Sequence, residues 1–339
     1  MSVPTRRAAA MAAIRRRLVQ AAAVFAVLSV LSHLGGQHWT LELLSHFRVQ
    51  FAAVAVMLAL FTLATRQWRI AALFGVLAAA HAAPLAGYLV DFAGTEAHAA
   101  GPRAKTLPLT VSYHNLRHRA ADHDGLFAHL KRAKPDVLVL TEMDYERRAD
   151  LFHGLRRQFP HFGATPGPSI FNVAVFSRFP LTEVERMLDT SNNWPMLHVR
   201  VCPEKERRCL RILALHAHPP FGRWTEVRNT AMQEAAMQAA GGEHDSVIVV
   251  GDFNCTPWSP DFHEMLKLGA LRDENRAGLA STWGGRSPLL GLQIDHILVG
   301  PGVEEGARRI GPSFGSDHFL LTAELEFAAP RLAPSASAP

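Results

Sequence analysis

The feature that most constrains this chain is a set of three long apolar runs in its first quarter, Leu18–Leu34, Gln50–Thr65 and Ile70–Val90. A helix needs about 20 apolar residues to cross the hydrocarbon core of a bilayer, so the middle run is marginal. The sequence therefore predicts a membrane region over residues 1–90 with about three transmembrane helices. The alternative is a signal peptide followed by a buried helical domain. It is disfavoured because no small-residue cleavage site precedes a polar mature start.

Basic residues around these runs predict how the chain crosses the membrane. Five arginines lie within residues 6–17, and Arg66 and Arg69 separate the second run from the third, whereas the first loop holds only Arg48 and Glu42. Because Lys and Arg concentrate in cytoplasmic loops, we expect the N-terminus and the second loop in the cytoplasm. Three crossings then place everything after the third run on the periplasmic or external side of a cell inner membrane.

The net charge of +5 belongs to the membrane-flanking part of the chain. Residues 1–104 carry nine Lys and Arg against three Asp and Glu, whereas residues 105–330 carry 25 against 27. The body of the protein is close to neutral and has no basic excess to attract a nucleic-acid backbone over long range. This weakens a nucleic-acid interpretation, although a local basic groove is compatible with a neutral domain.

After the membrane region, strand-like and helix-like patterns alternate. Residues 91–107 have the composition of a linker, residues 108–327 form the predicted catalytic domain, and residues 328–339 are expected to be disordered. Apolar runs predict strands at Leu109–Tyr113, Val137–Leu140, Phe171–Phe176, Leu197–Cys202, Leu210–Leu215, Val247–Val250, Ile294–Val299 and Phe319–Phe327. Helices are predicted at Gly125–Ala133, Tyr145–Gln158 and Thr225–Ala239. This alternation is typical of an α/β domain whose sheets are buried on both faces.

Polar residues stand at the ends of these predicted strands. They are Asn115, Glu142, His216, Asp252 and Asn254 after strands, Asp295 at the start of one, and Asp317 and His318 just before the last. A strand end directs such side chains off the edge of a rigid sheet, where several can converge. Each alone also has an ordinary explanation as a turn or surface residue, since Gly, Asp and Asn tolerate unusual backbone angles. Their joint occurrence favours a functional site.

Seven short stretches, in this order, resemble the endonuclease/exonuclease/phosphatase superfamily. This superfamily includes pancreatic-type deoxyribonuclease, abasic-site endonucleases, neutral sphingomyelinases and inositol-phosphate 5-phosphatases. The stretches are His114–Leu116, Pro135–Glu142, Val173–Pro180, Leu215–His216, Gly251–Asn254, Ile294–Ile297 and Ser316–His318. The resemblance extends from about Leu109 to Phe327. The most specific signal is the combination of a strand followed by Gly-Asp-Phe-Asn with a terminal Ser-Asp-His.

The resemblance implies both a fold and an activity. The implied fold class is α/β, a four-layer α-β-β-α sandwich of two packed mixed sheets with the active site at one edge, preceded here by the transmembrane helical region. The implied activity is Mg²⁺- or Mn²⁺-dependent phosphoester hydrolysis. This reaction needs an activated water, neutralised charge on the phosphoryl oxygens and a protonated leaving oxygen. A hard divalent cation held by oxygen ligands supplies the second requirement.

The resemblance also implies roles for individual residues. Glu142 is the leading metal ligand, with Asn115 beside it and Asp317 as a further metal contact. His318 is the general base, oriented by Asp295. The remaining residues are Asp252, which positions water or assists proton transfer, Asn254 and His216, which donate to phosphate oxygens, and Asn172, a substrate contact.

The number and identity of the metal ions and the role of the loop tryptophans each allow more than one interpretation. In abasic-site endonucleases an acidic residue stands two positions after the first Asn, where this chain has Arg117, so a single-metal site is the safer interpretation. His216-Ala217-His218 invites a zinc interpretation, but no Cys cluster or His-x₃-His helix accompanies it. The loop tryptophans are expected either to pack in the domain or to stack on a base or lie against lipid headgroups, and they are Trp194, Trp224, Trp258 and Trp283.

Two cysteines flank a polar turn between consecutive predicted strands. Opposed positions across an antiparallel hairpin bring Cβ atoms within reach of a disulfide in the closer register, so Cys202 and Cys209 are expected to pair. The alternative is two reduced cysteines. Cys255 is expected to remain a thiol.

The substrate is left among three classes: nucleic acid, a phospholipid headgroup ester or a small soluble phosphoester. The membrane is contacted through the N-terminal helices, and no protein partner can be inferred. The alternative function is a catalytically idle, membrane-tethered binding module that kept the fold. All of the core carboxylates and histidines are present, which favours the enzyme.

Overall fold

The computed structural model describes residues 6–90, 106–117, 122–143, 149–165, 171–188, 195–204, 208–241, 246–274 and 278–328. Most of the expected linker and tail, together with Trp194, lie outside these described residues. The chain divides into two compact units, Met1–Ala86 and Gly87–Pro339, which are described separately.

The N-terminal unit is helical. Its elements are α1 (Arg6–Leu31), the 3₁₀ helix η1 (Ser32–Gln37), α2 (Trp39–Ser45), α3 (Arg48–Ala64), α4 (Trp68–Ala82) and the 3₁₀ helix η2 (Ala83–Leu85), after which α5 (Ala86–Val90) crosses into the second unit. Two segments, Arg16–Gln37 and Trp68–Tyr88, are long and apolar enough to cross a membrane. The middle predicted run forms α3, which meets α2 at a 63° bend, and this pair makes a third candidate if it counts as one span.

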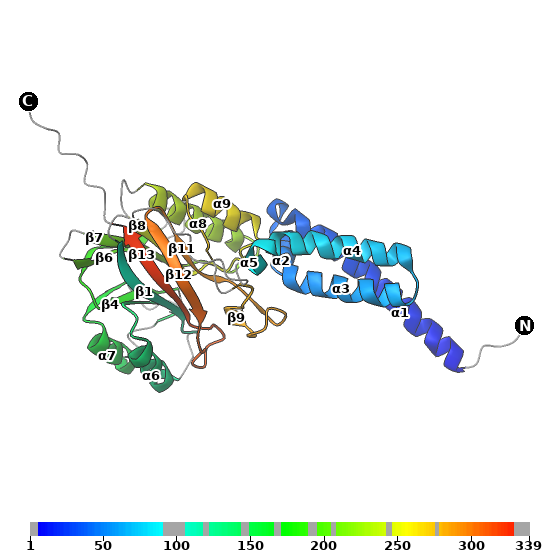
Figure 1. Ribbon diagram of the computed structural model, residues 1–339, viewed down its shortest axis with the longest axis horizontal. Helices are drawn as coiled ribbons and strands as arrows, with labels where there is room; N and C mark the ends of the chain where they lie inside the picture. The colour runs from blue at the N-terminus through cyan, green and yellow to red at the C-terminus, as the bar shows by residue number, and fades with distance from the viewer. Residues whose placement is uncertain are drawn as a thin grey trace, which may run out of the picture. The chain divides into compact units, whose positions relative to one another are not determined.

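Two sheets form the centre of the second unit (Figure 1). The first has the order β12-β13-β1-β2-β4-β3, with β1 (Thr106–Asn115), β2 (Val137–Thr141), β3 (His161–Ala164), β4 (Val173–Ser177), β12 (Val303–Ile310) and β13 (Leu321–Ala328). The second has the order β11-β8-β7-β6-β5, with β5 (Leu181–Leu188), β6 (Pro195–Glu204), β7 (Arg208–His216), β8 (Ser246–Asp252) and β11 (Asp295–Val299). A separate hairpin pairs β9 (Trp283–Gly284) with β10 (Gly291–Leu292).

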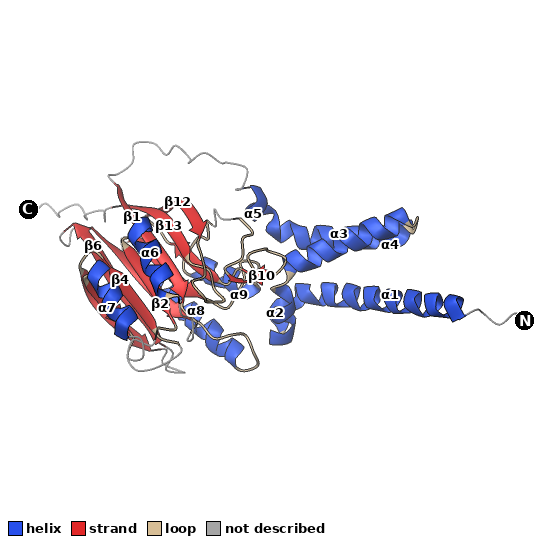
Figure 2. Cartoon of the chain, turned by 90° about the horizontal axis from the view of Figure 1, so that it is seen from below, coloured by secondary structure: helices blue, strands red, loops and turns tan. Residues whose placement is uncertain are grey.

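The two sheets pack face to face, and helices cover their outer faces (Figure 2). Alternate side chains fill the space between the sheets, as period-2 strands require; examples are Val111 and Tyr113 of β1 and Ile212 of β7. Helices α6 (His123–Ala133) and α7 (Ala149–Gln158) pack on the first sheet, and α8 (Trp224–Ala240) and α9 (Pro260–Leu268) pack on the second. The implied α-β-β-α sandwich of two packed mixed sheets is confirmed.

Strand direction brings the predicted polar residues to one edge of the sandwich. Strands β1 and β2 run parallel, so their carboxyl ends lie side by side. Strands β7 and β8 also run parallel, with His216 opposite Asp252. Strand β11 runs antiparallel to β8, and its first residue, Asp295, lies opposite Asp252. Five residues can therefore meet at this edge: those at the ends of β1, β2, β7 and β8 and the one at the start of β11.

The sequence predicted the central strands and the edge strand β11, but it missed the other three edge strands. Strands β3, β5 and β12, all at sheet edges, were not predicted, nor was α9. Polar and charged side chains on β5 and β12 interrupt the apolar pattern that identifies a strand. Among the predicted elements, the strand expected from Phe171 begins at Val173 and the one expected from Phe319 begins at Leu321. The helix expected from Tyr145 is seen from Ala149, and residues 144–148 lie outside the described part.

The expected cysteine pairing is present in the structure. Cys202 of β6 and Cys209 of β7 form a disulfide, which closes the turn between these antiparallel strands. Cys255 is buried and belongs to no disulfide.

Candidate active site

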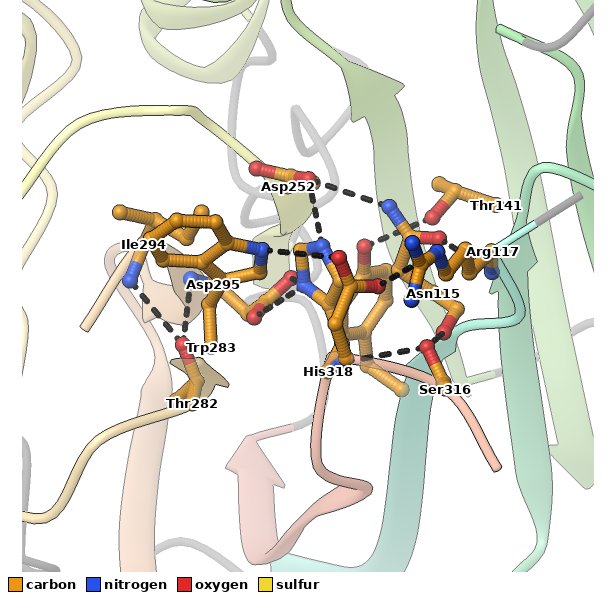
Figure 3. Close-up of polar contacts among 12 residues, drawn as sticks. Asn115, Arg117, Thr141, Asp252, Thr282, Trp283, Ile294, Asp295, Ser316 and His318 are labelled. Atoms are coloured by element: carbon orange, nitrogen blue, oxygen red, sulfur yellow. Dashed lines mark hydrogen bonds and ion pairs between the residues drawn. The ribbon is translucent and has the colours of Figure 1, made fainter. Parts of the chain in front are cut away.

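Side chains from five strands meet at the edge where the parallel strands end. They come from the ends of β1, β2, β7 and β8 and the start of β11, and are Asn115, Glu142, His216, Asp252 and Asp295. All of them except Glu142 are buried. The loop before β13 adds His318, which is also buried. Figure 3 shows three of the five, Asn115, Asp252 and Asp295, together with His318. The structure thus brings together six of the nine residues predicted for the site.

The imidazole of His318 lies between two carboxylates. Its Nδ1 is 2.9 Å and 3.0 Å from the two carboxylate oxygens of Asp295. Its Nε2 is 3.6 Å from Oδ2 of Asp252. A carboxylate on Nδ1 fixes the ring orientation and keeps the proton on that nitrogen, which leaves Nε2 to exchange protons with a reacting group.

Ser316 fixes the backbone that carries His318. The Ser316 hydroxyl donates to the carbonyl oxygen of Asn115 at 2.8 Å, and it accepts from the His318 N–H at 3.0 Å. The loop before β13 is therefore attached to the end of β1. Ser316 was present in the Ser-Asp-His motif but was not predicted as a site residue.

Thr282 performs the equivalent task for Asp295. Its hydroxyl oxygen accepts hydrogen bonds from the N–H groups of Ile294 and Asp295, both at 3.0 Å. Its carbonyl oxygen accepts from the Phe319 N–H at 2.7 Å. Both partners of the Asp295–His318 pair are therefore tied to one residue. No local sequence pattern could have identified this contact, because the segments it joins are distant in the chain.

A second group of contacts surrounds the amide of Asn115. Its Nδ2 donates to Glu142 Oε1 and to Asp252 Oδ2, each at 3.1 Å. His216 Nε2 lies 3.6 Å from Asp252 Oδ2 and 4.0 Å from Glu142 Oε1. The backbone of Glu142 has φ +56° and its N–H donates to the carbonyl oxygen of Asn172 at 3.0 Å. Two carboxylates thus reach the same amide nitrogen.

Burial and neighbouring charges shift the pKa values of Asp252 and His318. Burial raises the pKa of the Asp252 carboxyl group to about 8, and the neighbouring Asp295 charge adds to the increase. Burial alone lowers the pKa of His318, but the charge and hydrogen bonds of Asp295, aided by the Asp252 charge, outweigh it and raise that pKa to about 9. Shifts of this size in a cluster of buried acids are typical of functional sites.

Residues 112–318 match the model of the Endonuclease/Exonuclease/phosphatase family. The chain belongs to this family. The match includes every strand end described above, and members of the superfamily are metal-dependent phosphoesterases and nucleases. No curated protein matches the chain at a significant level.

Solved structures with the endonuclease/exonuclease/phosphatase fold support the architecture. The 3′ phosphatase NExo from Neisseria, bound to a product DNA hairpin, is 20% identical with a TM-score of 0.51 over 63% of this chain and 98% of that one. An AP endonuclease from Archaeoglobus fulgidus is 16% identical, with a TM-score of 0.53, and the match covers 63% of this chain and 98% of the endonuclease. An endonuclease/exonuclease/phosphatase family protein from Bacteroides thetaiotaomicron is 16% identical, with a TM-score of 0.52, and the match covers 66% of this chain and 99% of that protein. At these identities the likeness shows the fold.

The donor set at the edge of this family domain fits a hard divalent cation. Glu142 and Asp252 each direct a carboxylate oxygen at the amide nitrogen of Asn115, and oxygen is the ligand that Mg²⁺ and Mn²⁺ prefer. Burial raises the pKa of Asp252 and the neighbouring Asp295 charge raises it further, and a cation would relieve this second effect. Asp252, Asp295 and His318 likewise have ligand atoms within 4.8 Å of one another. We favour the Glu142 side, because both Asp295 oxygens are already directed at His318 Nδ1.

The zinc interpretation receives no geometric support within the described residues. The ring of His218 stacks on Trp224 at 4.2 Å and lies 4.6 Å from Phe171. Burial lowers the pKa of His218 to about 4, so its ring is neutral and serves as an aromatic surface. Among the tryptophans, Trp258 is buried, whereas Trp224 and Trp283 are exposed beside the site.

Asp317 lies at the rim, where it has partners other than the carboxylates. Its Oδ2 accepts a hydrogen bond from Trp283 Nε1 at 3.2 Å, and its Oδ1 is 3.7 Å from Arg117 Nε. Asn115 presents its amide nitrogen to the carboxylates, while its Oδ1 accepts from the Arg117 N–H at 2.8 Å. The metal-ligand roles of Asp317 and Asn115 therefore stay predictions, and each would require its side chain to rotate.

Asn254 and Asn172 line the same edge. The Asn254 amide donates to the carbonyl oxygen of Ala217 at 2.9 Å, and its backbone N–H donates to Asp252 Oδ1 at 2.9 Å. Asn172 is buried, and its Oδ1 accepts from the Thr165 hydroxyl at 3.4 Å. Both side chains are held in place, and their substrate contacts stay predictions.

Proposed function

We propose that this chain is a Mg²⁺- or Mn²⁺-dependent phosphodiester hydrolase that is anchored in a membrane by its N-terminal helices. The observation that carries the proposal is the meeting of Glu142, Asp252 and the Asp295–His318 pair at one sheet edge in a domain of this family. Nucleic acids, phospholipids and small soluble phosphodiesters all carry the phosphodiester group that this site would cleave.

The residues of the site divide into a cation-binding side and a proton-transfer side. Glu142, together with Asp252, would hold the cation. A bound divalent cation supplies positive charge that offsets the phosphoryl oxygens and lowers the pKa of neighbouring acids. On the other side, His318 in its neutral form takes a proton from the attacking water at Nε2, while Asp295 on Nδ1 stabilises the imidazolium that forms. The positive charge of a cation beside Asp252 would favour this neutral form, because it would lower the pKa of His318 from its metal-free value of about 9.

The remaining residues orient the reactants. Asp252 lies between His216 and His318, so its Oδ2 can accept a hydrogen bond from the attacking water. Asn254 and His216 donate to the phosphoryl oxygens, where hydrogen bonds stabilise developing charge in a buried site. Asn172 contacts the substrate from the end of the loop before β4.

The test is hydrolysis of bis-p-nitrophenyl phosphate by the full-length protein in detergent, with plasmid DNA as a parallel substrate. We expect EDTA to abolish hydrolysis and added Mg²⁺ or Mn²⁺ to restore it. Inhibition by 1,10-phenanthroline without rescue by Mg²⁺ would replace this proposal with a zinc enzyme. A lack of hydrolysis of both substrates at every metal concentration would support the idle binding module instead.

A further inference from the structure

Exposed apolar side chains of the second unit gather beside the site. Eight large hydrophobic residues are exposed among the described residues of this unit, and five of them lie in two short segments. These five, which we call the hydrophobic rim, are Phe221, Trp224, Trp283, Leu289 and Leu290. Scattered exposed apolar residues are ordinary on a protein surface, but a cluster of them beside a functional site indicates an interaction surface.

The first segment continues directly from β7. Phe221 and Trp224 follow His216 by five and eight residues. Trp224 stacks on His218, and the guanidinium carbon of Arg223 lies 4.5 Å from the centre of the Trp224 ring. An aromatic and basic surface thus extends outward from His216.

The second segment is the β9–β10 hairpin, which carries Leu290, the most exposed large apolar side chain among the described residues of the unit. Leu290 is 78% exposed and Leu289 is 51% exposed. The turn that carries them is internally bonded, since Leu290 N–H donates to Ser287 O at 2.8 Å and Gly285 N–H to Leu290 O at 3.1 Å. The two leucines are therefore held outward by a closed turn.

This hairpin is attached to the catalytic loop by its backbone. Trp283 forms a bridge with His318, and the Gly284 N–H donates to the Asp317 carbonyl oxygen at 2.9 Å. Arg286, in the turn, places its guanidinium carbon 5.0 Å from the centre of the Phe319 ring. A surface that binds through this hairpin would consequently lie against the entrance to the site.

The chemistry of the rim matches a lipid surface. Trp residues favour the boundary between headgroups and acyl chains, and leucines favour the acyl region. Arg223 and Arg286 are both exposed and would face anionic headgroups. Only 15 residues separate Val90, at the end of the apolar helices, from Thr106, at the start of β1. Fully extended, such a segment spans about 50 Å, which would keep the second unit close to the bilayer.

We propose that the hydrophobic rim docks the second unit on the anionic surface of the membrane that holds the N-terminal helices. One consequence rests on the proposed phosphoesterase function: the docked site takes phosphoesters of lipid headgroups in that membrane. The docking itself does not depend on catalysis and can be measured separately.

A fluorescent label at Leu290→Cys tests the docking. Cys202 and Cys209 are joined and Cys255 is buried, so the introduced thiol is the accessible one. The full-length protein is reconstituted in vesicles of mixed zwitterionic and anionic lipid and labelled with a polarity-sensitive dye. Met237→Cys, on α8 at 55% exposure, is the matched control.

We expect the label at position 290 to shift to the blue and to be quenched by brominated lipid, and the label at 237 to do neither. High salt or vesicles without anionic lipid should weaken the effect at 290. Equal behaviour of the two labels would overturn the proposal. A blue shift at 290 that persists in detergent and grows with protein concentration would also overturn it, in favour of contact with a second copy.

The catalytic consequence has its own test. The double variant Leu289→Ser, Leu290→Ser should hydrolyse bis-p-nitrophenyl phosphate like the wild type but release headgroup phosphate from vesicles at least about 10²-fold more slowly, the scale for loss of two buried leucines. Equal rates on vesicles would contradict lipid presentation by the rim. If the wild type cleaves neither substrate, the phosphoesterase function fails, and the label experiment still decides the docking.

Discussion

At the scale of single residues, the most specific expectation is that Asp295 and His318 act as one unit. Both Asp295 oxygens approach His318 Nδ1, so Asp295 acts on the reaction through the ring. We predict that His318→Ala and Asp295→Asn each lower kcat by about 10²-fold or more. The double variant should be little worse than either single variant. Steady-state kinetics on bis-p-nitrophenyl phosphate measure this, and fully multiplicative losses would show that the two residues work independently.

The pKa shifts of Asp252 and His318 predict how pH affects the metal-free protein. Both groups hold their protons more tightly in the folded state, with pKa values of about 8 and about 9. The raised pKa of His318 stabilises the folded state fully below about pH 6.5, and this contribution is lost as pH rises through 9. The contribution of Asp252 to the stability of the folded state falls as pH rises from about 4 to 8. We expect the Tm in EDTA to decrease as pH rises from 6 to 9.

The variant Asp252→Asn separates this effect from general alkaline destabilisation. An amide cannot ionise, yet its oxygen can still accept the Asn254 N–H, so the penalty for burying the charge disappears. We predict a higher Tm than wild type at pH 8 in EDTA and a shallower decrease with pH, together with loss of activity. A Tm below wild type across the whole range would contradict the raised pKa of Asp252.

At the scale of elements, the sequence was sufficient for the fully buried strands of each sheet, including the edge strand β11, and insufficient for the edge strands β3, β5 and β12. Strand β8 is buried along its whole length, and its apolar run predicted it. Strand β12 was missed because its buried positions include Glu305 and Arg308, which pair with each other, so no apolar alternation marks the strand. The site residues at strand ends were predictable because strand direction places them. Ser316 and Thr282 were not, since their roles depend on contacts between distant segments.

One element-level contact supports the loop after β8. Arg228 of α8 is fully buried; it donates to Asp261 of α9 at 2.7 Å and to the carbonyl oxygen of Asn254 at 3.4 Å. We predict that Arg228→Met lowers the free energy of unfolding by about 2 kcal/mol, since it leaves a partly buried carboxylate without its partner. It should also lower kcat, because Asn254 loses this support.

The control for Arg228→Met is Arg309→Met. Arg309 pairs with Glu324 on an exposed face, where ion pairs contribute about 0–1 kcal/mol. Thermal unfolding and kcat are measured for both variants. Equal effects of the two substitutions would contradict a supporting role for Arg228.

At the scale of the whole molecule, the arginine distribution and the disulfide lead to one prediction about the compartment of the second unit. The arginine distribution predicts that the second unit lies outside the cytoplasm. A disulfide between Cys202 and Cys209 persists in oxidising compartments and is rare in the cytosol. We predict that non-reducing mass mapping of protein from its native membrane finds these two cysteines linked and Cys255 as a thiol. Free thiols at both positions, with a C-terminal reporter active only in the cytoplasm, would contradict this orientation.

The most direct measurement of the central claim compares Glu142→Gln with wild type in the metal-dependent hydrolysis of bis-p-nitrophenyl phosphate. This change removes one negative charge beside Asn115 and Asp252 with little change in volume. The control is Glu324→Gln, on the exposed face of β13. We predict that Glu142→Gln lowers kcat by about 10²-fold or more and raises the Mg²⁺ concentration needed for activity, with the Tm unchanged. Activity and Mg²⁺ dependence equal to those of Glu324→Gln would contradict a metal-dependent phosphoesterase at this site.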